Sequence, residues 1–111
     1  MTSAEQPAPA HRTRIKLCGL STPEAVAHAI DLGADAVGFV FYPPSPRSVS
    51  VAQAVELTRD LPPFVSVVGL FVNATPQWMS EVASNVSLTM LQFHGDETPE
   101  QCESLASVAG L

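Results

Sequence analysis

The stretch DAVGFVF, residues 35–41, decides the fold, because a short apolar run rich in Val and Phe is typical of a strand buried on both faces. Three other runs have the same character: residues 14–18 (RIKLC), 65–72 (VSVVGLFV) and 88–94 (LTMLQFH). Strands buried in this way need helices to cover them. The segments between the four runs are therefore expected to contain helices.

Helix-start signals follow each of the four runs. Threonine followed by proline occurs at Thr22, Thr75 and Thr98, where Thr can cap a helix and Pro can occupy its first position without losing a hydrogen bond. The fourth start, SVAQ at residues 50–53, is a capping box. Apolar residues then recur every three or four positions, as on one helix face. The expected stops are Gly33, Pro62-Pro63 and Gly110.

Four successive strand–helix units predict an α/β fold with a parallel sheet, because strands joined by helical crossovers are parallel and the crossovers are right-handed. The turn after the first strand, CGLS at residues 18–21, has one glycine and no phosphate loop, which disfavours a doubly wound nucleotide-binding fold. A TIM (β/α)8 barrel is favoured, and such barrels need about 200 to 250 residues. Residues 14–111 are therefore expected to form a parallel (β/α)4 half of a barrel, preceded by a short disordered tail at residues 1–13.

Composition disfavours several classes of function. The chain has 11 acidic and 5 basic residues and a formal net charge of −6, which opposes binding to a nucleic-acid backbone. No apolar run reaches the roughly 18 residues needed to cross a membrane. The two cysteines, Cys18 and Cys102, are too few for a disulfide framework, so we expect free thiols in the cytoplasm. No side chains show metal-ligand spacing, and neither a metal nor another cofactor is expected.

Polar side chains near the strand ends are the candidates for chemistry, because barrel active sites lie at the carboxyl ends of the strands. If Ile15 and Leu17 face the helices, Lys16 and Cys18 point into the barrel. A thiol one pleat from an ammonium group suits a base or a nucleophile. A plain buried core cysteine is the competing interpretation, and Gly19 favours function because it leaves space beside the thiol.

Two further candidates follow the second and fourth strands. Arg47 lies in a loop with three prolines, YPPSPRS at residues 42–48, and a preordered guanidinium suits a carboxylate or phosphate, although a solvated surface arginine would look the same. Gln92 and His94 share one strand face, with His94 at its mouth, where a purely structural histidine is the alternative. The other polar residues nearby are interpreted as turn or solvated-loop residues: Asn73, Asp96 and Glu97.

Five blocks of the sequence together resemble the phosphoribosylanthranilate isomerase family. They are RIKLCGL at residues 14–20, GADAVGFVF at 33–41, SPR at 45–47, GLFVN at 69–73 and LQFHG at 91–95. The resemblance implies an aldose–ketose isomerase of tryptophan biosynthesis, which converts N-(5-phosphoribosyl)anthranilate into its ribulose-type ketone by an Amadori rearrangement. The implied partner is thus a small phosphorylated substrate.

The resemblance also implies roles for the candidate residues. Cys18 corresponds to the general base of the family, and Arg47 to the arginine that holds the anthranilate carboxylate. Gln92 and His94 match residues that line the pocket mouth, and Lys16 joins them as a candidate for substrate binding. The family's general acid, at the end of the fifth strand, and its phosphate grip, after the seventh and eighth strands, have no counterpart in these residues.

The 111 residues alone are therefore expected to be an inactive N-terminal half. Its first and last strands would be open edges, which favours self-association. We expect its inner face to carry Val67, Phe71, Leu88 and Met90. A non-catalytic half-barrel that assembles with or complements another chain is the alternative function. A pentose-phosphate epimerase is disfavoured, because it would need a metal site or acid–base carboxylates at the strand ends.

Overall fold

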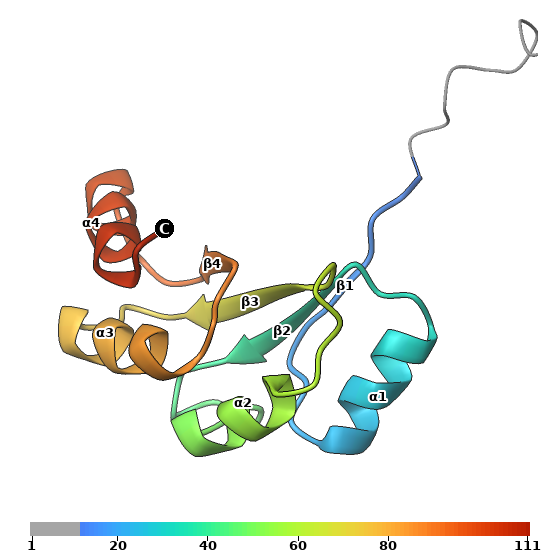
Figure 1. The fold of residues 1–111 in the computed structure, drawn as a ribbon. Helices are drawn as coiled ribbons and strands as arrows, with labels where there is room; N and C mark the ends of the chain where they lie inside the picture. Colours follow the sequence, from blue (N-terminus) through green and yellow to red (C-terminus); the bar gives the residue numbers. More distant parts are fainter. Residues whose placement is uncertain (1–11) are drawn as a thin grey trace, which may run out of the picture.

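The computed structural model describes residues 12–111, and the first eleven residues lie outside the described part, as does most of the tail expected at 1–13. Strands and helices alternate along the described chain (Figure 1). Their bounds are β1 (Lys16–Leu17), α1 (Pro23–Asp31), β2 (Ala36–Val40), α2 (Val51–Thr58), β3 (Ser66–Phe71), α3 (Pro76–Asn85), β4 (Met90–Phe93) and α4 (Pro99–Ala109). Within residues 12–111, none of the helices is long and apolar enough to cross a membrane.

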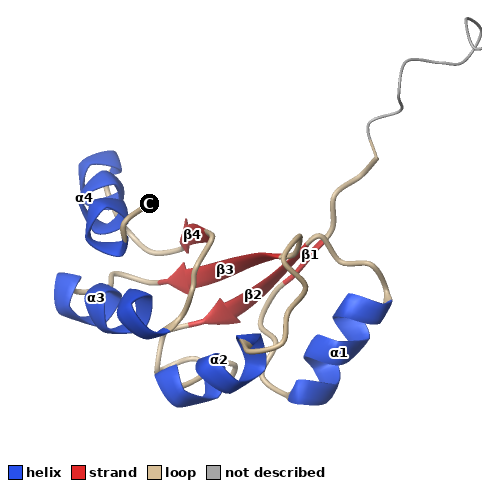
Figure 2. Ribbon diagram, viewed as in Figure 1, coloured by secondary structure: helices blue, strands red, loops and turns tan. Residues whose placement is uncertain are grey.

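The strands form one parallel sheet in the order β1-β2-β3-β4. The helices α1, α2 and α3 each connect two neighbouring strands, and α4 follows β4. Right-handed crossovers of this kind place successive helices on the same face of the sheet. Figure 2 shows the helices arranged along the outside of the strands, with α1 and α4 at the two ends. The predicted α/β fold with a parallel (β/α)4 arrangement is confirmed.

Side-chain caps begin all four helices where the sequence predicted them. The hydroxyl oxygens of Thr22, Thr75 and Thr98 each accept a hydrogen bond from the third helical N–H at 3.1 Å. Ser50 forms the predicted capping box with Gln53, through bonds of 3.1 and 2.9 Å. Each cap satisfies an N–H group that a helix otherwise leaves unpaired, which stabilises the helix by about 1 kcal/mol.

Two of the three predicted helix stops are glycines in the left-handed conformation, Gly33 at φ +82° and Gly110 at φ +78°. The stop predicted at the Pro62-Pro63 pair is wrong in position, because α2 already ends at Thr58. The Thr58 hydroxyl donates to the Ala54 carbonyl at 2.7 Å, and the following N–H groups bond three residues back. The helix therefore tightens and ends before the prolines.

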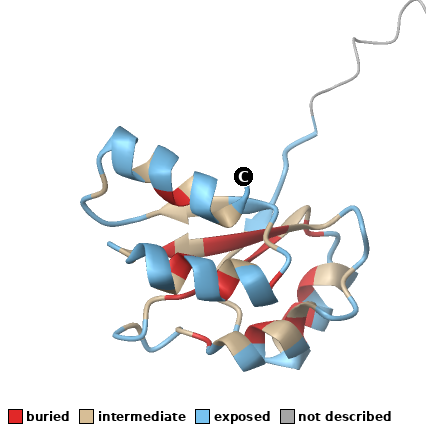
Figure 3. Ribbon diagram, turned by 60° about the vertical axis from the view of Figure 1, so that its left-hand side comes forward, coloured by how far each residue is buried: buried red, intermediate tan, exposed pale blue. Residues whose placement is uncertain are grey.

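The core lies between the helices and the outer face of the sheet (Figure 3). Phe39, Phe41 and Phe71 are at most 1 % exposed, and each such ring contributes about 1.5–3 kcal/mol through its burial. The rings of Phe41 and Phe71 stack with their centroids 5.4 Å apart. Met79 and Val82 of α3 complete the most deeply buried part of this cluster.

The predicted composition of the inner face is wrong for Val67, Phe71 and Leu88, which pack on the helix side. The register pairs Met90 with Val68, so it is Val68 that shares the inner face with Met90. Large apolar residues gain more burial under the helices, and Leu88 precedes the first residue of β4, so strand alternation does not apply to it. Met90 alone of the four is on the inner face, where it is 55 % exposed.

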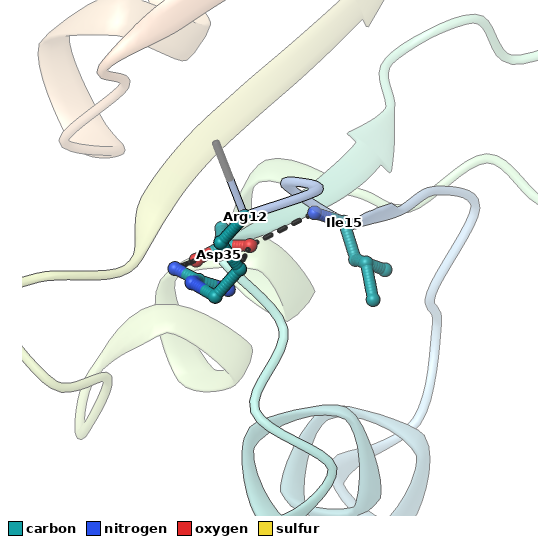
Figure 4. Close-up of polar contacts among 3 residues, drawn as sticks. All are labelled: Arg12, Ile15 and Asp35. Carbon is teal, nitrogen blue, oxygen red and sulfur yellow. Dashed lines mark hydrogen bonds and ion pairs between the residues drawn. The ribbon is translucent and has the colours of Figure 1, made fainter. Parts of the chain in front are cut away.

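At the amino-terminal ends of the strands, the Asp35 carboxylate forms hydrogen bonds with the segment that leads into β1 (Figure 4). It accepts two hydrogen bonds from the Arg12 guanidinium, at 2.5 and 3.1 Å, and one from the Ile15 N–H at 2.8 Å. The bond from Arg12, followed by the bond from Ile15, lowers the pKa of Asp35. Arg12, which the sequence assigned to a disordered tail, is thus paired with a residue at the start of β2.

Candidate active site

The register of the sheet defines three levels of side chains on its inner face. From the amino-terminal end upward, the first level holds Lys16, Ala36 and Ser66; the second holds Cys18, Gly38, Val68 and Met90; and the third holds Val40, Leu70 and Gln92. Three of the predicted site residues are therefore on one face: Lys16, Cys18 and Gln92. They come from the two edge strands, β1 and β4.

Cys18 lies directly after β1 and is half-buried. A Cβ atom placed on Gly38 would lie 2.9 Å from the Cys18 sulfur, closer than such atoms approach one another. Glycine at position 38 therefore provides the space that the thiol occupies. Cys18 points to the inner face, as the alternation of side chains predicted, and it does not enter the core beneath the helices.

Arg47 crosses the end of β1 and lies against Gly19, the residue after the thiol. A Cβ on Gly19 would lie 2.9 Å from the Arg47 Cδ atom and 3.2 Å from its Nη1 atom. Gly19 also has a left-handed backbone, with φ at +78°. Both the space and the conformation require glycine here. The structure thus places the exposed Arg47 side chain beside the residue that follows Cys18, although the two candidate residues lie far apart in the sequence.

Hydrogen bonds within the loop fix the backbone that presents Arg47. The Ser45 N–H donates to the Tyr42 carbonyl at 2.8 Å, and the Ser48 N–H donates to the Ser45 carbonyl at 3.1 Å. The backbone N–H of Arg47 donates a hydrogen bond to the Ser45 hydroxyl oxygen at 3.2 Å. Together with the prolines, these bonds restrict the loop to one turn-rich path.

One residue that supports this loop, Trp78, was not predicted from the sequence. The indole N–H of Trp78, near the start of α3, donates a hydrogen bond to the Phe41 carbonyl at 2.9 Å. Phe41 directly follows the last residue of β2, so this bond lies where the loop begins. The residue type itself was a signal in the sequence, because a tryptophan that packs against a protein needs an acceptor for its indole N–H. Trp78 is the single tryptophan of the chain.

A contact across the inner face joins Lys16 to Gln92. The Lys16 ammonium donates a hydrogen bond to the Gln92 side-chain carbonyl oxygen, although the two residues belong to opposite edges of the sheet. Lys16 is exposed and Gln92 is half-buried. The two side chains therefore reach toward each other over β2 and β3.

The loops after β3 and β4 are fastened to each other. The Glu97 carboxylate accepts bonds from the Asn73 N–H at 2.7 Å and the Gly95 N–H at 2.8 Å, and the Asn73 carboxamide oxygen accepts one from the Asp96 N–H at 2.9 Å. Asn73 has a left-handed backbone at φ +48°, in agreement with its interpretation as a turn former. Glu97 is half-buried in this loop, and its carboxylate joins the two loops, a contact that the sequence did not predict.

The electrostatics of Glu97 agree with this role. Desolvation acts to raise its pKa, but the bonds from the N–H groups of Glu97, Asn73 and Gly95, with the nearby His94, outweigh it and lower the pKa. His94 itself is exposed and directly follows β4, and its backbone N–H donates a hydrogen bond to the Phe71 carbonyl at 2.9 Å. His94 and Cys18 therefore lie at opposite edges of the sheet, unlike Cys18 and Arg47.

The donor set in the described residues fits organic anions better than metals. Within residues 12–111, no group of three or more His, Cys, Asp or Glu side chains is arranged to hold a metal ion. The inner face and its mouth instead combine a thiol, an ammonium, a guanidinium and a carboxamide. Such a set can bind a carboxylate and can move a proton at a neighbouring carbon.

Comparisons with known proteins agree on one family. The sequence model of the N-(5'-phosphoribosyl)anthranilate (PRA) isomerase family matches residues 15–109 of this chain. The curated N-(5'-phosphoribosyl)anthranilate isomerase of Ralstonia nicotianae is 61 % identical over 103 residues, which are 93 % of this chain and 45 % of that protein. The corresponding protein of Ralstonia pickettii is 56 % identical, over 93 % of this chain and 44 % of its own length.

Solved structures give the same result. The phosphoribosyl anthranilate isomerase of Thermotoga maritima is 45 % identical with a TM-score of 0.82, and the match covers 86 % of this chain and 47 % of that one. A phosphoribosyl anthranilate isomerase in complex with reduced 1-(o-carboxyphenylamino)-1-deoxyribulose 5-phosphate has the same identity and TM-score, over 86 % and 50 % of the two chains. The chain spans about half the length of the relatives that it matches.

Proposed function

The chain belongs to the N-(5'-phosphoribosyl)anthranilate isomerase family, and on this basis we propose that it supplies the N-terminal half of the active site of such an enzyme. The substrate would be N-(5-phosphoribosyl)anthranilate, and the reaction an Amadori rearrangement in tryptophan biosynthesis. One observation carries the proposal: the Arg47 side chain, from the loop after β2, lies against Gly19, the residue that directly follows Cys18.

Cys18 is the general base in this proposal. Once the sugar ring opens, the amine and C1 form a protonated imine, which makes the hydrogen on C2 acidic. The Cys18 thiolate takes that proton, and the electron pair of the C–H bond moves toward the imine nitrogen to give an enol-amine, which rearranges to the ketone. A base of modest strength is sufficient for this step if the site excludes water.

Arg47 holds the carboxylate of the anthranilate ring. Its guanidinium offers two parallel N–H donors, the geometry that a carboxylate accepts best. The bonds within the loop and the bond from Trp78 at its start hold the loop before substrate arrives, which reduces the entropy that binding costs. Gln92 and His94, on the opposite edge strand, would line the same mouth.

Family membership further suggests that the general acid and the phosphate grip belong to the remaining part of the relatives, because this chain spans 45 % of the Ralstonia nicotianae protein. We therefore propose that a polypeptide of these residues alone does not accelerate the rearrangement. Its edge strands β1 and β4 would favour self-association. The free thiols of Cys18 and Cys102 fit a reducing cytoplasm.

A chimeric enzyme tests the function. This chain replaces the matching 103 residues of the Ralstonia nicotianae protein, which then supplies the other half of the barrel. We expect the chimera to consume the substrate in a fluorescence assay, whereas the isolated polypeptide does not. A correctly folded chimera without activity would favour the alternative, a half-barrel that serves only as an assembly module. Activity of the isolated polypeptide would refute the proposed division of the site.

A further inference from the structure

The contact between Lys16 and Gln92 crosses the part of the inner face that holds Cys18. Lys16 is on the first level of side chains and Gln92 is on the third. The level between them contains Cys18, Gly38, Val68 and Met90. Two side chains that meet from the first and third levels on opposite edges must pass over this middle level. We call the hydrogen-bonded pair of Lys16 and Gln92 the inner bridge.

The burial of Gly38 and Val68, on the two central strands of the middle level, agrees with this path, whereas Met90 on the edge strand β4 is 55 % exposed. Val68 is only 3 % exposed, although its face of the sheet has no helix over it. Gly38 is buried as well, and it has no side chain of its own to fill the space. Cys18 occupies that space from one side. The stem of a lysine commonly covers apolar surface of this kind while its charged end finds a polar partner.

The chemistry of the bridge leaves its positive charge uncancelled. Among residues 12–111 the ion pairs join Arg12 to Asp35 and Arg59 to Glu56, and Lys16 is in neither. Its partner Gln92 is a neutral amide, which orients the ammonium without neutralising it. Residues two apart in an extended chain are separated by about 7 Å, so Lys16 and Cys18, which directly follows β1, are neighbours. At this separation a positive charge favours a thiolate over a thiol, even though Lys16 is exposed and water weakens the effect.

Other charged groups that face Cys18 are few. The inner side chains of β2 and β3 carry no charge, and β4 contributes the neutral Gln92. Arg47 lies over Gly19 and faces the mouth, where the proposed function engages it with a carboxylate. His94 lies at the end of β4. Lys16 is thus the cation on the inner face itself.

We propose that Lys16 is a positioning residue for Cys18: Gln92 holds its ammonium over Gly38, where it favours the thiolate over the thiol. This inference rests on the proposed role of Cys18 as the base and changes the role of Lys16 from substrate binding to support of that base. Gln92 would act through Lys16, and Gly38 would keep the space in which the sulfur and the ammonium approach each other.

The test measures the thiol directly and does not require isomerase activity. The full chain carries Cys102→Ser, so that Cys18 is the remaining cysteine, and its alkylation by iodoacetamide is followed from pH 6 to 10. Lys16→Met should lower the rate at pH 7 about fivefold and move the rise of the rate to higher pH. Lys16→Arg should restore most of the rate. Gln92→Glu should resemble Lys16→Met, because it keeps the bridge but cancels its charge.

Arg14→Met is the matched control, since it removes the same charge from the same edge of the sheet without touching the bridge. It should change the alkylation rate little. Circular dichroism verifies that each variant retains its helices. A Lys16→Met protein that alkylates like its parent overturns the inference; if that variant loses its fold, an unchanged rate in Gln92→Glu overturns it instead. The proposed function fails separately, if the chimera with intact Lys16 and Cys18 is folded but inactive.

Discussion

The two ends of the β1–β2 pair use arginine in opposite ways. At the amino-terminal end, the guanidinium of Arg12 is matched by the Asp35 carboxylate, and the contact fastens one segment of the chain to another. At the carboxyl end, Arg47 lies against Gly19, the residue after Cys18, and among the described residues it belongs to no ion pair. Charge at the first end is satisfied within the protein, whereas charge at the second is available to a ligand.

This difference follows from what each end must do. A paired surface arginine adds to stability and leaves little charge for other molecules. An unpaired arginine held in place by its loop costs stability, but it binds an anion without first breaking an ion pair. The same asymmetry between stability and chemistry is general in barrels, whose working residues lie at the carboxyl ends of the strands.

The largest expected effect is at the carboxyl end, where Cys18→Ala should lower kcat of the chimera about a hundredfold or more. The reason is that loss of a general base leaves the proton on the sugar carbon without an acceptor. Steady-state kinetics with the fluorescence assay measure it. Cys102→Ala, on α4, is the matched control and should leave kcat unchanged. Near-normal turnover by Cys18→Ala would remove Cys18 from the proposed mechanism.

Arg47→Ala should act mainly on binding, with an increase in KM of about tenfold or more and a smaller decrease in kcat. Arg47 is proposed to contact a carboxylate that is present in both the ground state and the transition state, so its loss weakens both alike. The two constants are measured in the chimera, and Arg59→Ala provides a control for loss of one surface guanidinium. If kcat fell while KM stayed constant, the carboxylate clamp would be the wrong role.

The sequence predicted the elements of this fold well because their signals are local. Thr-Pro pairs, the capping box at Ser50 and the apolar runs each depend on residues a few positions apart. The assignment of faces was less successful. Alternation along one strand states which residues share a face, but only the pairing of Met90 with Val68 decides which face that is.

The site was predicted only in part for a similar reason. Cys18, Arg47 and Lys16 were identified from their own strands and loops, but the contact of Lys16 with Gln92 joins residues 76 positions apart. The contacts of Glu97 were missed because the Asn73 N–H is brought to its carboxylate by the parallel arrangement of β3 and β4. Interactions between loops depend on the register of the sheet, which single-sequence patterns do not contain.

An intermediate effect is expected from the support of the Arg47 loop. Trp78→Phe keeps most of the ring but removes the N–H that reaches the Phe41 carbonyl. Stability of the chimera should fall by about 1 kcal/mol, measured by urea denaturation, because one hydrogen bond is lost and its acceptor stays partly buried. KM should rise two- to threefold, less than in Arg47→Ala. A Trp78→Phe enzyme with unchanged stability and unchanged KM would show that this bond does not support the loop.

The smallest effect is expected at the amino-terminal end, where Arg12→Ala should lower the Tm of the chimera at pH 7 and leave its kinetics unchanged. The sign of the pH dependence follows from the lowered pKa of Asp35, which the bond from Arg12 lowers first and the bond from the Ile15 N–H next. An unfolded aspartate titrates near pH 3.9, at about its ordinary value. Above that pH the carboxylate is charged in both states and the stabilisation by Arg12 is fully present. As the pH falls through the lower pKa of the folded state, Asp35 takes up a proton and this contribution is lost. The difference in Tm between Arg12→Ala and the parent should therefore narrow below about pH 4.

Arg59→Ala, which breaks an exposed pair at the end of α2, is the control and should produce a smaller difference in Tm at pH 7. That pair joins neighbouring side chains, whereas the Arg12–Asp35 pair joins two separate segments. A Tm difference for Arg12→Ala that persisted at pH 2 would show that the arginine stabilises the protein by some means other than its contact with Asp35.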